Sequence, residues 1–438
     1  MKHPQKGAGG ANMSKWNREK GRVAIVVLDS VGAGQMHDAA AYGDEGANTL
    51  GNISQKTGLP LPELGKLGLG NILFIKGTPP MAEPKGAWGL MAEASQGKDT
   101  TTGHWEIAGL VLPGPFPTYT DTGFPKDVRD KFESLIGREC IWKATYSGTE
   151  LLKDFGEEHL KTGKPIVYTS ADSVFQVAAH EEHFTIDCAK GSLKGIDALY
   201  EACRIARDEV LNGEHAVGRV IARPFVGTCS ADFKRTANRH DYALNPIGPT
   251  ILSRLYKAGF DTIGVGKIKD IFAGDGISEY TYNKGMKSLA PSISGKMSEV
   301  ERTDPAGIEN TLSYLKKDFN GLLFVNLVDC DMLFGHRNDV AGYRENLIRF
   351  DTELPSILKL LREDDILIIT ADHGCDPTYP GTDHSREFVP LLVYGQKVKA
   401  GVQLGVRKSF ADIAATIAEL FGVEGTGHGE SFASVILD

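Results

Sequence analysis

The sequence predicts an α/β protein: a doubly wound core with a smaller α/β domain inserted into it. Continuous apolar runs such as Val23–Leu28 and Ile366–Ile369 are typical of parallel strands that are buried on both faces. Segments with apolar residues at helical spacing alternate with these runs. At 438 residues, the chain is long enough for one large core and a second domain.

The large domain is expected to comprise residues 21–112 and 247–438. Its first strand is Val23–Leu28, and the same pattern returns after residue 246. The later strands are predicted at Thr262–Gly266, Gly321–Val328, Ile366–Ile369 and Phe388–Tyr394. Two amphipathic helices are predicted at Tyr343–Leu361 and Phe410–Phe421, because each places its apolar residues on one face.

Residues 113–246 are expected to form the inserted domain. It opens with the linker-like Pro113-Gly-Pro-Phe-Pro117 and then has its own alternation of strand, helix and strand at Pro165–Thr169, Gly195–Asn212 and Arg219–Ala222. Residues 1–20 are polar and basic and lack the apolar stretch of a signal peptide. We expect them to be a disordered extension.

Composition excludes several classes of function. The chain has 48 basic and 57 acidic residues, a net charge of −9, and no basic block, which argues against nucleic-acid binding. No window approaches the length of a membrane span. Its six cysteines show no CxxC spacing, which fits unpaired thiols in a reducing cytoplasm. Local arginines, lysines and metal ions would therefore have to bind an anionic substrate.

Aspartate and histidine residues follow several of the predicted strands in the sequence. Asp331-x4-His336 and Asp372-His373 follow two strands, and His384 follows shortly after. Oxygen and nitrogen ligands without thiolate suit manganese or zinc, and three clusters favour two metal ions. Asp29, at the end of the first strand, is a further candidate because ligands bind at the carboxyl ends of such strands. Each pair alone is equally consistent with a strand-end cap or a surface pair.

The segment Lys98–Glu106 predicts a helix N-terminus at Thr100-Thr-Thr. Backbone N–H groups at such an end can bind a phosphate, and the helix dipole favours negative charge there. A threonine beside a metal ion could act as a nucleophile. A threonine-rich helix cap without chemistry is the alternative.

Several motifs resemble those of the phosphopentomutase family in the alkaline phosphatase superfamily, from about Arg22 to the C-terminus. They are Val27-Leu-Asp-Ser-Val-Gly32, Lys98-Asp-Thr-x-Thr-Gly-His-Trp-Glu106, Tyr168-Thr-Ser-Ala-Asp-Ser-Val174, Asp331-x4-His336, Ala371-Asp-His-Gly-Cys-Asp-Pro377 and Gly381-Thr-Asp-His-Ser-Arg-Glu387. The string around Thr100 is highly specific, whereas the Asp-His pair is shared across the superfamily.

The resemblance implies two Mn²⁺ ions and a set of site residues. One metal would be bound by Asp331, His336 and His384, and the other by Asp29, Asp372 and His373. The family register selects Thr100 as the nucleophile. Four further residues are implied at the site. Asp172 would contact a sugar hydroxyl, and Arg223 and Arg239 would bind the phosphate. Lys267 would line the site.

The implied activity is that of an isomerase acting on a small phosphosugar. It would interconvert ribose 1-phosphate or 2-deoxyribose 1-phosphate with the 5-phosphate through a phosphothreonine and a ribose bisphosphate. Hexose 1,6-bisphosphate or ribose 1,5-bisphosphate would supply the first phosphoryl group. The alternatives are another member of the superfamily, such as cofactor-independent phosphoglycerate mutase or a metal phosphatase, and a non-catalytic metal-stabilised binding protein. The sequence does not define the oligomeric state, and a monomer is consistent with it.

Overall fold

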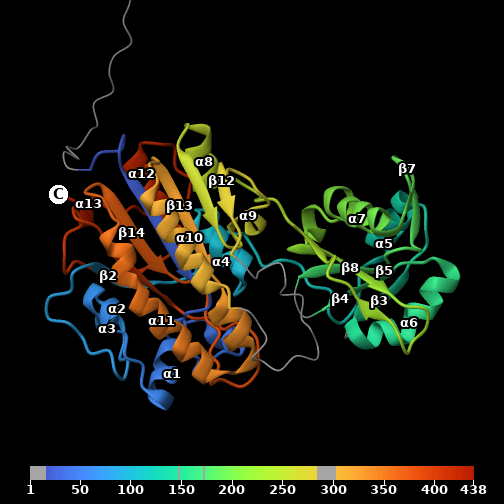
Figure 1. The fold of residues 1–438 in the computed structure, drawn as a ribbon, viewed down its shortest axis with the longest axis horizontal. Coiled ribbons are helices and arrows are strands. Elements are labelled where there is room, and N and C mark those ends of the chain that lie inside the picture. Colours follow the sequence, from blue (N-terminus) through green and yellow to red (C-terminus); the bar gives the residue numbers. More distant parts are fainter. Residues whose placement is uncertain (1–15, 147, 171–172, 284–301) are drawn as a thin grey trace, which may run out of the picture. The chain divides into compact units, whose positions relative to one another are not determined.

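The computed structural model describes residues 16–146, 148–170, 173–283 and 302–438. The chain separates into two compact units (Figure 1). Described residues 16–113, 246–283 and 302–438 form the first unit, and residues 114–245 form the second. Both contain sheets and helices, so the predicted α/β class is confirmed.

The first unit is built on an eight-stranded mixed sheet with the order β12-β11-β13-β1-β14-β15-β2-β16. Its strands are β1 (Arg22–Leu28), β2 (Ala87–Met91), β11 (Asp261–Val265), β12 (Glu279–Thr281), β13 (Gly321–Leu327), β14 (Asp365–Thr370), β15 (Val389–Tyr394) and β16 (Gln403–Arg407). The three central strands β13, β1 and β14 run parallel to one another, and all their residues are buried. Burial on both faces explains their continuous apolar sequences.

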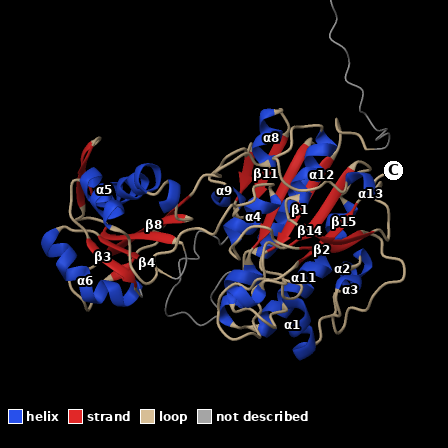
Figure 2. Cartoon of the chain, turned by 180° about the vertical axis from the view of Figure 1, so that it is seen from behind, coloured by secondary structure: helices blue, strands red, loops and turns tan. Residues whose placement is uncertain are grey.

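Helices cover both faces of this sheet (Figures 1 and 2). Helices α10 and α11 pack on one side with α1, α2 and α3, whereas α8 and α9 pack on β11 and β13 from the other side, where α12 contacts α8 and α4. The doubly wound prediction is therefore confirmed. The helices are α1 (Thr49–Thr57), α2 (Pro62–Leu67), α3 (Leu69–Ile72), α4 (Thr100–Ile107), α8 (Ile251–Lys257), α9 (Ile268–Ile271), α10 (Asp304–Lys316), α11 (Val340–Lys359), α12 (Asp412–Phe421) and α13 (Ala433–Ile436), with a 3₁₀ turn η1 (Ala39–Tyr42).

The central strands end at one edge of the sheet. Leu28 of β1 lies in register with Leu327 of β13, and Val27 lies beside Thr370 of β14. The residues that follow these strands therefore emerge side by side, as the parallel pairing requires. After β13 the chain forms a π-helical turn, η6 (Cys330–Phe334), and a 3₁₀ turn, η7 (Gly335–Arg337).

The second unit contains a six-stranded sheet in the order β10-β8-β5-β4-β3, with β9 paired to β8, and a separate β6-β7 hairpin. One hydrophobic cluster includes Phe132, Val177 and Leu199, and a second includes Leu151, Ala178 and Phe225. Neighbouring residues of β5 thus point to different cores. The elements are β3 (Ile141–Thr145), β4 (Ile166–Thr169), β5 (Val174–His180), β6 (Thr185–Cys188), β7 (Gly191–Lys194), β8 (Arg219–Val226), β9 (Lys234–Arg235), β10 (His240–Ala243), α5 (Lys126–Ile136), α6 (Gly148–Thr162), α7 (Gly195–Ile205), η2 (Ala206–Val210) and η3 (Gly213–His215).

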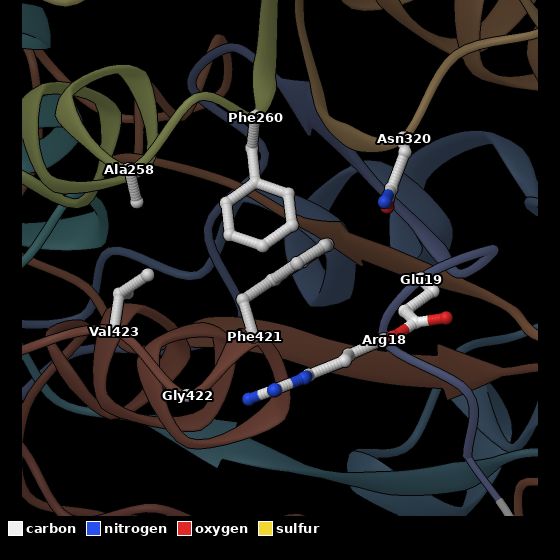
Figure 3. Close-up of a pocket in the computed structure, with 8 residues that line it drawn as sticks. All are labelled: Arg18, Glu19, Ala258, Phe260, Asn320, Phe421, Gly422 and Val423. Atoms are coloured by element: carbon white, nitrogen blue, oxygen red, sulfur yellow. The ribbon is translucent and has the colours of Figure 1, made fainter.

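Residues 16–20 differ from the predicted disordered extension. The Trp16 ring is buried edge-on against Phe421, with the ring centroids 5.2 Å apart, and the Asn17 N–H donates to Asp364 Oδ1 at 3.0 Å. The burial of the Trp16 ring stabilises this segment against the rest of the first unit, although the rest of the segment is polar. Next to it, a surface hollow of about 360 Å³ is lined by Arg18, Glu19, Ala258, Phe260, Asn320, Phe421, Gly422 and Val423 (Figure 3). Within the described part of the chain, every helix is too short or too polar to span a bilayer.

Candidate metal centre

The ends of β1 and β14 bring together Asp29, Asp372 and His373. His373 Nε2 lies 3.5 Å from Asp29 Oδ1 and 3.3 Å from Asp372 Oδ2. All three side chains are buried, with an exposed fraction of at most 1%. Asp29 is far from Asp372 and His373 in sequence, and the parallel pairing of β1 with β14 makes them adjacent.

The turn after β13 supplies a second group. Asp331 Oδ1 lies 3.2 Å from His384 Nε2 and 3.4 Å from His336 Nε2. The rings of His373 and His384 are 4.0 Å apart between centroids, so this group adjoins the first. The structure thus brings all six predicted metal ligands into one cluster.

Four buried atoms in this cluster have no hydrogen-bond partner among the described residues: Asp29 Oδ1, Asp331 Oδ1, Asp372 Oδ2 and His384 Nε2. Leaving buried polar atoms unpaired costs about 1–3 kcal/mol each, more for charged groups. Asp29 and Asp372 form with His373 one group whose ligand atoms lie within 4.8 Å of one another, and Asp331 and His384 form with His373 a second such group. Such an arrangement fits a divalent cation.

The histidine tautomers fit the same role. His373 Nδ1 lies 3.0 Å from the carbonyl oxygen of Gly374, and His336 Nδ1 lies 2.6 Å from that of Thr382. A carbonyl oxygen can only accept, so each Nδ1 carries a proton, and Nε2 is the ring nitrogen available to a metal ion. Metal-bound histidines are commonly oriented in this way.

The carboxyl groups of Asp29 and Asp372 have pKa values that are shifted in opposite directions. Burial raises the pKa of Asp29 to about 7, with further increases from the charges of Asp372 and Asp331. His373 and Lys267 oppose this increase. Burial is also the largest influence on Asp372 and acts against its ionisation, but the charges of His373 and His104 and the hydrogen bond from the Ser30 N–H together lower the pKa of that carboxyl. Without a cation, Asp29 is therefore the carboxyl that retains a proton near neutral pH.

Lys267 follows β11 and immediately precedes α9, with a half-buried side chain. It acts on Asp29 through its charge, which lowers the pKa of that carboxyl. Lys267 is therefore linked to the cluster through its charge interaction with Asp29.

Cys375 also joins this site, although it was not predicted as a ligand. Its thiol can form a metal-binding group with Asp331 and His336, with all three ligand atoms within 4.8 Å of one another. Burial, followed by the charge of Asp331, raises the pKa of the thiol well above its usual value. The thiol thus remains protonated when no metal is bound. Its position two residues after His373 was the signal in the sequence.

Thr100 is the first residue of α4, and its hydroxyl faces the cluster. Its Oγ1 lies 3.2 Å from His373 Nε2. Asp99 caps the helix by accepting from the N–H groups of Thr101 at 3.0 Å and Thr102 at 3.1 Å. The Thr102 hydroxyl also donates to Asp99. Of these neighbours, Thr100 is therefore the one whose hydroxyl contacts a predicted metal ligand.

His104 and Asn326 are two buried residues that sequence reasoning left without a role. The Asn326 amide nitrogen donates to Asp29 Oδ2 at 2.8 Å and faces His104 Nε2 at 3.2 Å. His104 Nε2 thus accepts, and the protonated Nδ1 donates to the Thr100 carbonyl at 2.9 Å while lying 3.0 Å from Asp372 Oδ2. These two side chains connect both carboxylates to the start of α4. One signal was available: Asn326 is the only polar side chain in the run Gly321–Val328.

The predicted phosphate-binding arginines lie in the second unit. Arg223 donates to Gln176 Oε1 at 3.0 Å, and burial lowers its pKa to about 10. Arg239 makes two 2.7 Å hydrogen bonds to Asp241. The charge of Arg239 also lowers the pKa of Arg223, so the two guanidinium groups are close enough to interact. Asp172 lies outside the described residues.

Comparison with known proteins gives the site its context. The model of the metalloenzyme superfamily matches residues 21–425. A phosphopentomutase of Carboxydothermus hydrogenoformans is 54% identical over 412 residues, which cover 94% of this chain and 98% of that protein. A phosphopentomutase of Symbiobacterium thermophilum is 54% identical over 417 residues, 95% of this chain and 98% of that protein. The chain therefore belongs to the phosphopentomutase family of the metalloenzyme superfamily.

Proposed function

We propose that this chain, an isomerase by its family, interconverts ribose 1-phosphate and 2-deoxyribose 1-phosphate with the corresponding 5-phosphates. The observation that carries the proposal is the contact between the Thr100 hydroxyl and His373, inside a cluster of six predicted metal ligands. A mutase must transfer a phosphoryl group without losing it to water, and a protein nucleophile beside a cation site suits that task.

The residues of the cluster fit two Mn²⁺ ions. Asp331, His336 and His384 would bind one ion, and Asp29, Asp372 and His373 the other. Carboxylate oxygens and imidazole nitrogens are suitable ligands for manganese. When bound, the ions neutralise charge on the phosphoryl group and on the oxygens that attack and leave. A hexose 1,6-bisphosphate or ribose 1,5-bisphosphate would supply the first phosphoryl group.

In the reaction, the Thr100 oxygen would carry the phosphoryl group between the two positions of the sugar. Phosphorylated Thr100 would donate to a free sugar hydroxyl, forming a ribose bisphosphate that returns its other phosphoryl group to Thr100. The N-terminus of α4 favours negative charge at this position. Asn326 and His104 would hold Asp29 and the Thr100 backbone in place. Catalysis then depends mainly on positioning and charge stabilisation.

We assign residues 113–246 the role of a cap domain, on a core formed by residues 21–112 and 247–438. Arg223 and Arg239 would bind the substrate phosphate, because guanidinium groups pair with phosphate oxygens in a bidentate manner. Asp172 would bind a sugar hydroxyl, and Lys267 would line the catalytic site near Asp29.

We further propose that the chain works in the reducing cytoplasm. All six of its cysteines are free thiols, which fits that compartment. All six proposed metal ligands and Thr100 come from one chain, so a monomer would hold a complete metal centre.

A coupled assay with purified chain tests the proposal. Conversion of ribose 1-phosphate to ribose 5-phosphate is expected with Mn²⁺ and a bisphosphate activator, and it should be lost after chelation. The comparison substrate is 3-phosphoglycerate, because phosphoglycerate mutases are the alternative within the superfamily. Turnover of 3-phosphoglycerate without turnover of ribose 1-phosphate would contradict the proposal.

A further inference from the structure

Ser30, the residue directly after Asp29, has an unusual backbone conformation. Its φ is 70°, in the left-handed region that residues other than glycine rarely adopt, and it is fully buried. This conformation costs about 1–2 kcal/mol for an L-residue. Such strain persists only where the surrounding structure holds it, and it clusters at functional sites.

The conformation aims the Ser30 backbone at the loop after β14. The Ser30 N–H donates to Asp372 Oδ1 at 3.1 Å, and the Ser30 carbonyl accepts from the Cys375 N–H at 3.1 Å. With Oδ1 held in this way, Asp372 keeps Oδ2, the oxygen without a hydrogen-bond partner among the described residues, for the cluster. Ser30 therefore links the carboxylate at the end of β1 to the carboxylate at the end of β14.

Tyr343 of α11 contacts Ser30 twice. Its hydroxyl donates to the Ser30 carbonyl at 2.8 Å and lies 2.9 Å from Ser30 Oγ. The tyrosine has one hydroxyl proton, and the carbonyl can only accept, so Ser30 Oγ–H must donate to the tyrosine oxygen. The two bonds close a ring that involves both the backbone and the side chain of Ser30. Tyr343 is itself fully buried.

We propose that Tyr343 is a positioning residue whose hydroxyl holds Ser30 in its left-handed conformation, so that the Ser30 N–H orients Asp372 for the cation. The inference rests on the proposed metal centre. Residues that orient metal ligands from outside typically contribute about 10–100-fold to metal affinity. We expect the Tyr343 hydroxyl to contribute about tenfold.

The test uses metal-free full-length chain titrated with Mn²⁺ by calorimetry. Tyr343→Phe keeps the ring in the core and removes only the hydroxyl, so about a tenfold loss of affinity at one of the sites is expected. Tyr314→Phe is the matched control. The buried Tyr314 hydroxyl contacts Thr281 and Glu279, which are not predicted ligands. The Mn²⁺ affinity of this variant should therefore match that of the wild type. Thermal unfolding of each metal-free variant confirms that it is folded.

A glycine background separates positioning from general packing. Glycine adopts positive φ readily, so in a Ser30→Gly chain the backbone no longer needs the tyrosine. The Tyr343→Phe change should then alter Mn²⁺ affinity by less than about threefold, well under its effect in the Ser30 background. An equal loss in both backgrounds would overturn the inference, and so would unchanged affinity of Tyr343→Phe alone. A wild-type chain that binds no Mn²⁺ would instead overturn the metal centre and, with it, this inference.

Discussion

At the scale of single residues, the proposed chemistry depends on one hydroxyl among three consecutive threonines. Thr100 Oγ1 is 3.2 Å from His373, whereas Thr102 donates its hydroxyl to the helix cap Asp99. Removing the Thr100 hydroxyl deletes the proposed nucleophile and leaves all six proposed metal ligands unchanged.

Thr100→Ala should therefore lower mutase turnover by more than about 1000-fold while Mn²⁺ binding remains measurable. Thr101→Ala is the control, and its turnover should stay within about threefold of the wild type, because its side chain has no assigned role. Turnover is measured with ribose 1-phosphate and metal content by elemental analysis. Wild-type turnover in the Thr100 variant would exclude Thr100 as the nucleophile.

The histidines of the Asp331 group offer a second test. His336 and His384 both approach Asp331 Oδ1, at 3.4 and 3.2 Å. His336→Ala and His384→Ala should each reduce bound Mn²⁺ from about two ions to about one per chain after dialysis, because each loses one of three ligands. The exposed His183 in the second unit provides the control as His183→Ala. Two ions per chain in both variants would contradict the ligand set.

Asp29 makes the stability of the metal-free chain depend on pH. Its pKa rises from 3.8 to about 7 on folding, mainly through burial, so the folded state keeps a proton that the unfolded state releases. This contribution therefore destabilises the fold increasingly as the pH rises through that interval and levels off above it. Asp29→Asn cannot ionise, and above about pH 7 it should be about 1–3 kcal/mol more stable than the metal-free wild type.

Urea unfolding of both metal-free proteins across that pH range measures this difference. The gap should narrow as the pH falls toward about 3, because below the unfolded-state pKa of 3.8 the carboxyl becomes protonated in both states. With Mn²⁺ present the order should reverse, because only the wild type retains the complete ligand set. A gap that does not depend on pH would show that Asp29 is not the responsible group.

At the scale of elements, helix α4 can approach the end of β14 because Gly103 has no side chain. A Cβ at Gly103 would lie 2.1 Å from the carbonyl oxygen of Asp372, closer than any real contact. Helix propensity alone favours alanine by about 1 kcal/mol, but a clash with backbone cannot be relieved by a rotamer change. The helix that carries Thr100 would have to move away from the cluster.

Gly103→Ala should therefore lower turnover by at least about 100-fold and destabilise the fold by about 1–3 kcal/mol. Gly425→Ala is the matched control, since a Cβ there meets nothing within 4 Å. Turnover and urea unfolding are measured for both variants. A Gly103 variant with normal turnover would show that the position of α4 is not critical.

The elements that were predicted correctly are those whose sequence directly reflects burial. Strands β1, β13 and β14 were found within one or two residues, because strands buried on both faces have continuous apolar sequences. Strand β2 (Ala87–Met91) and its neighbour β16 (Gln403–Arg407) were not predicted. Both are short, contain glycine and are only partly buried, so no clear apolar pattern marks them. The helix predicted through Asn212 ends at Ile205 and continues as the π turn η2.

At the scale of the whole molecule, the proposed metal ions would stabilise only part of the chain. All six ligands belong to the first unit, whereas the second unit has its own sheet and hydrophobic clusters. A ligand that binds only the folded state stabilises it by about 2.7 kcal/mol at 100 times its Kd. Metal binding should therefore stabilise the first unit and not the second.

In differential scanning calorimetry, Mn²⁺ should raise the midpoint of the transition of the first unit by several degrees and leave that of the second unit unchanged. Mg²⁺-free buffer with a chelator gives the baseline. Asp29→Asn should abolish the increase. An equal increase in that variant would place the stabilising ion elsewhere in the chain.

The sequence by itself determined the α/β class, the central strands and the identity of six clustered residues, because apolar runs and the residues that follow them are local features of the chain. Only the tertiary structure showed how Ser30 and Tyr343, or Asn326 and His104, support those residues. Each of these contacts joins distant segments through one or two hydrogen bonds, and no periodicity in the sequence encodes such pairs. Distances and partners arise when strands pair and helices pack, so the geometry of the site is a property of the folded chain.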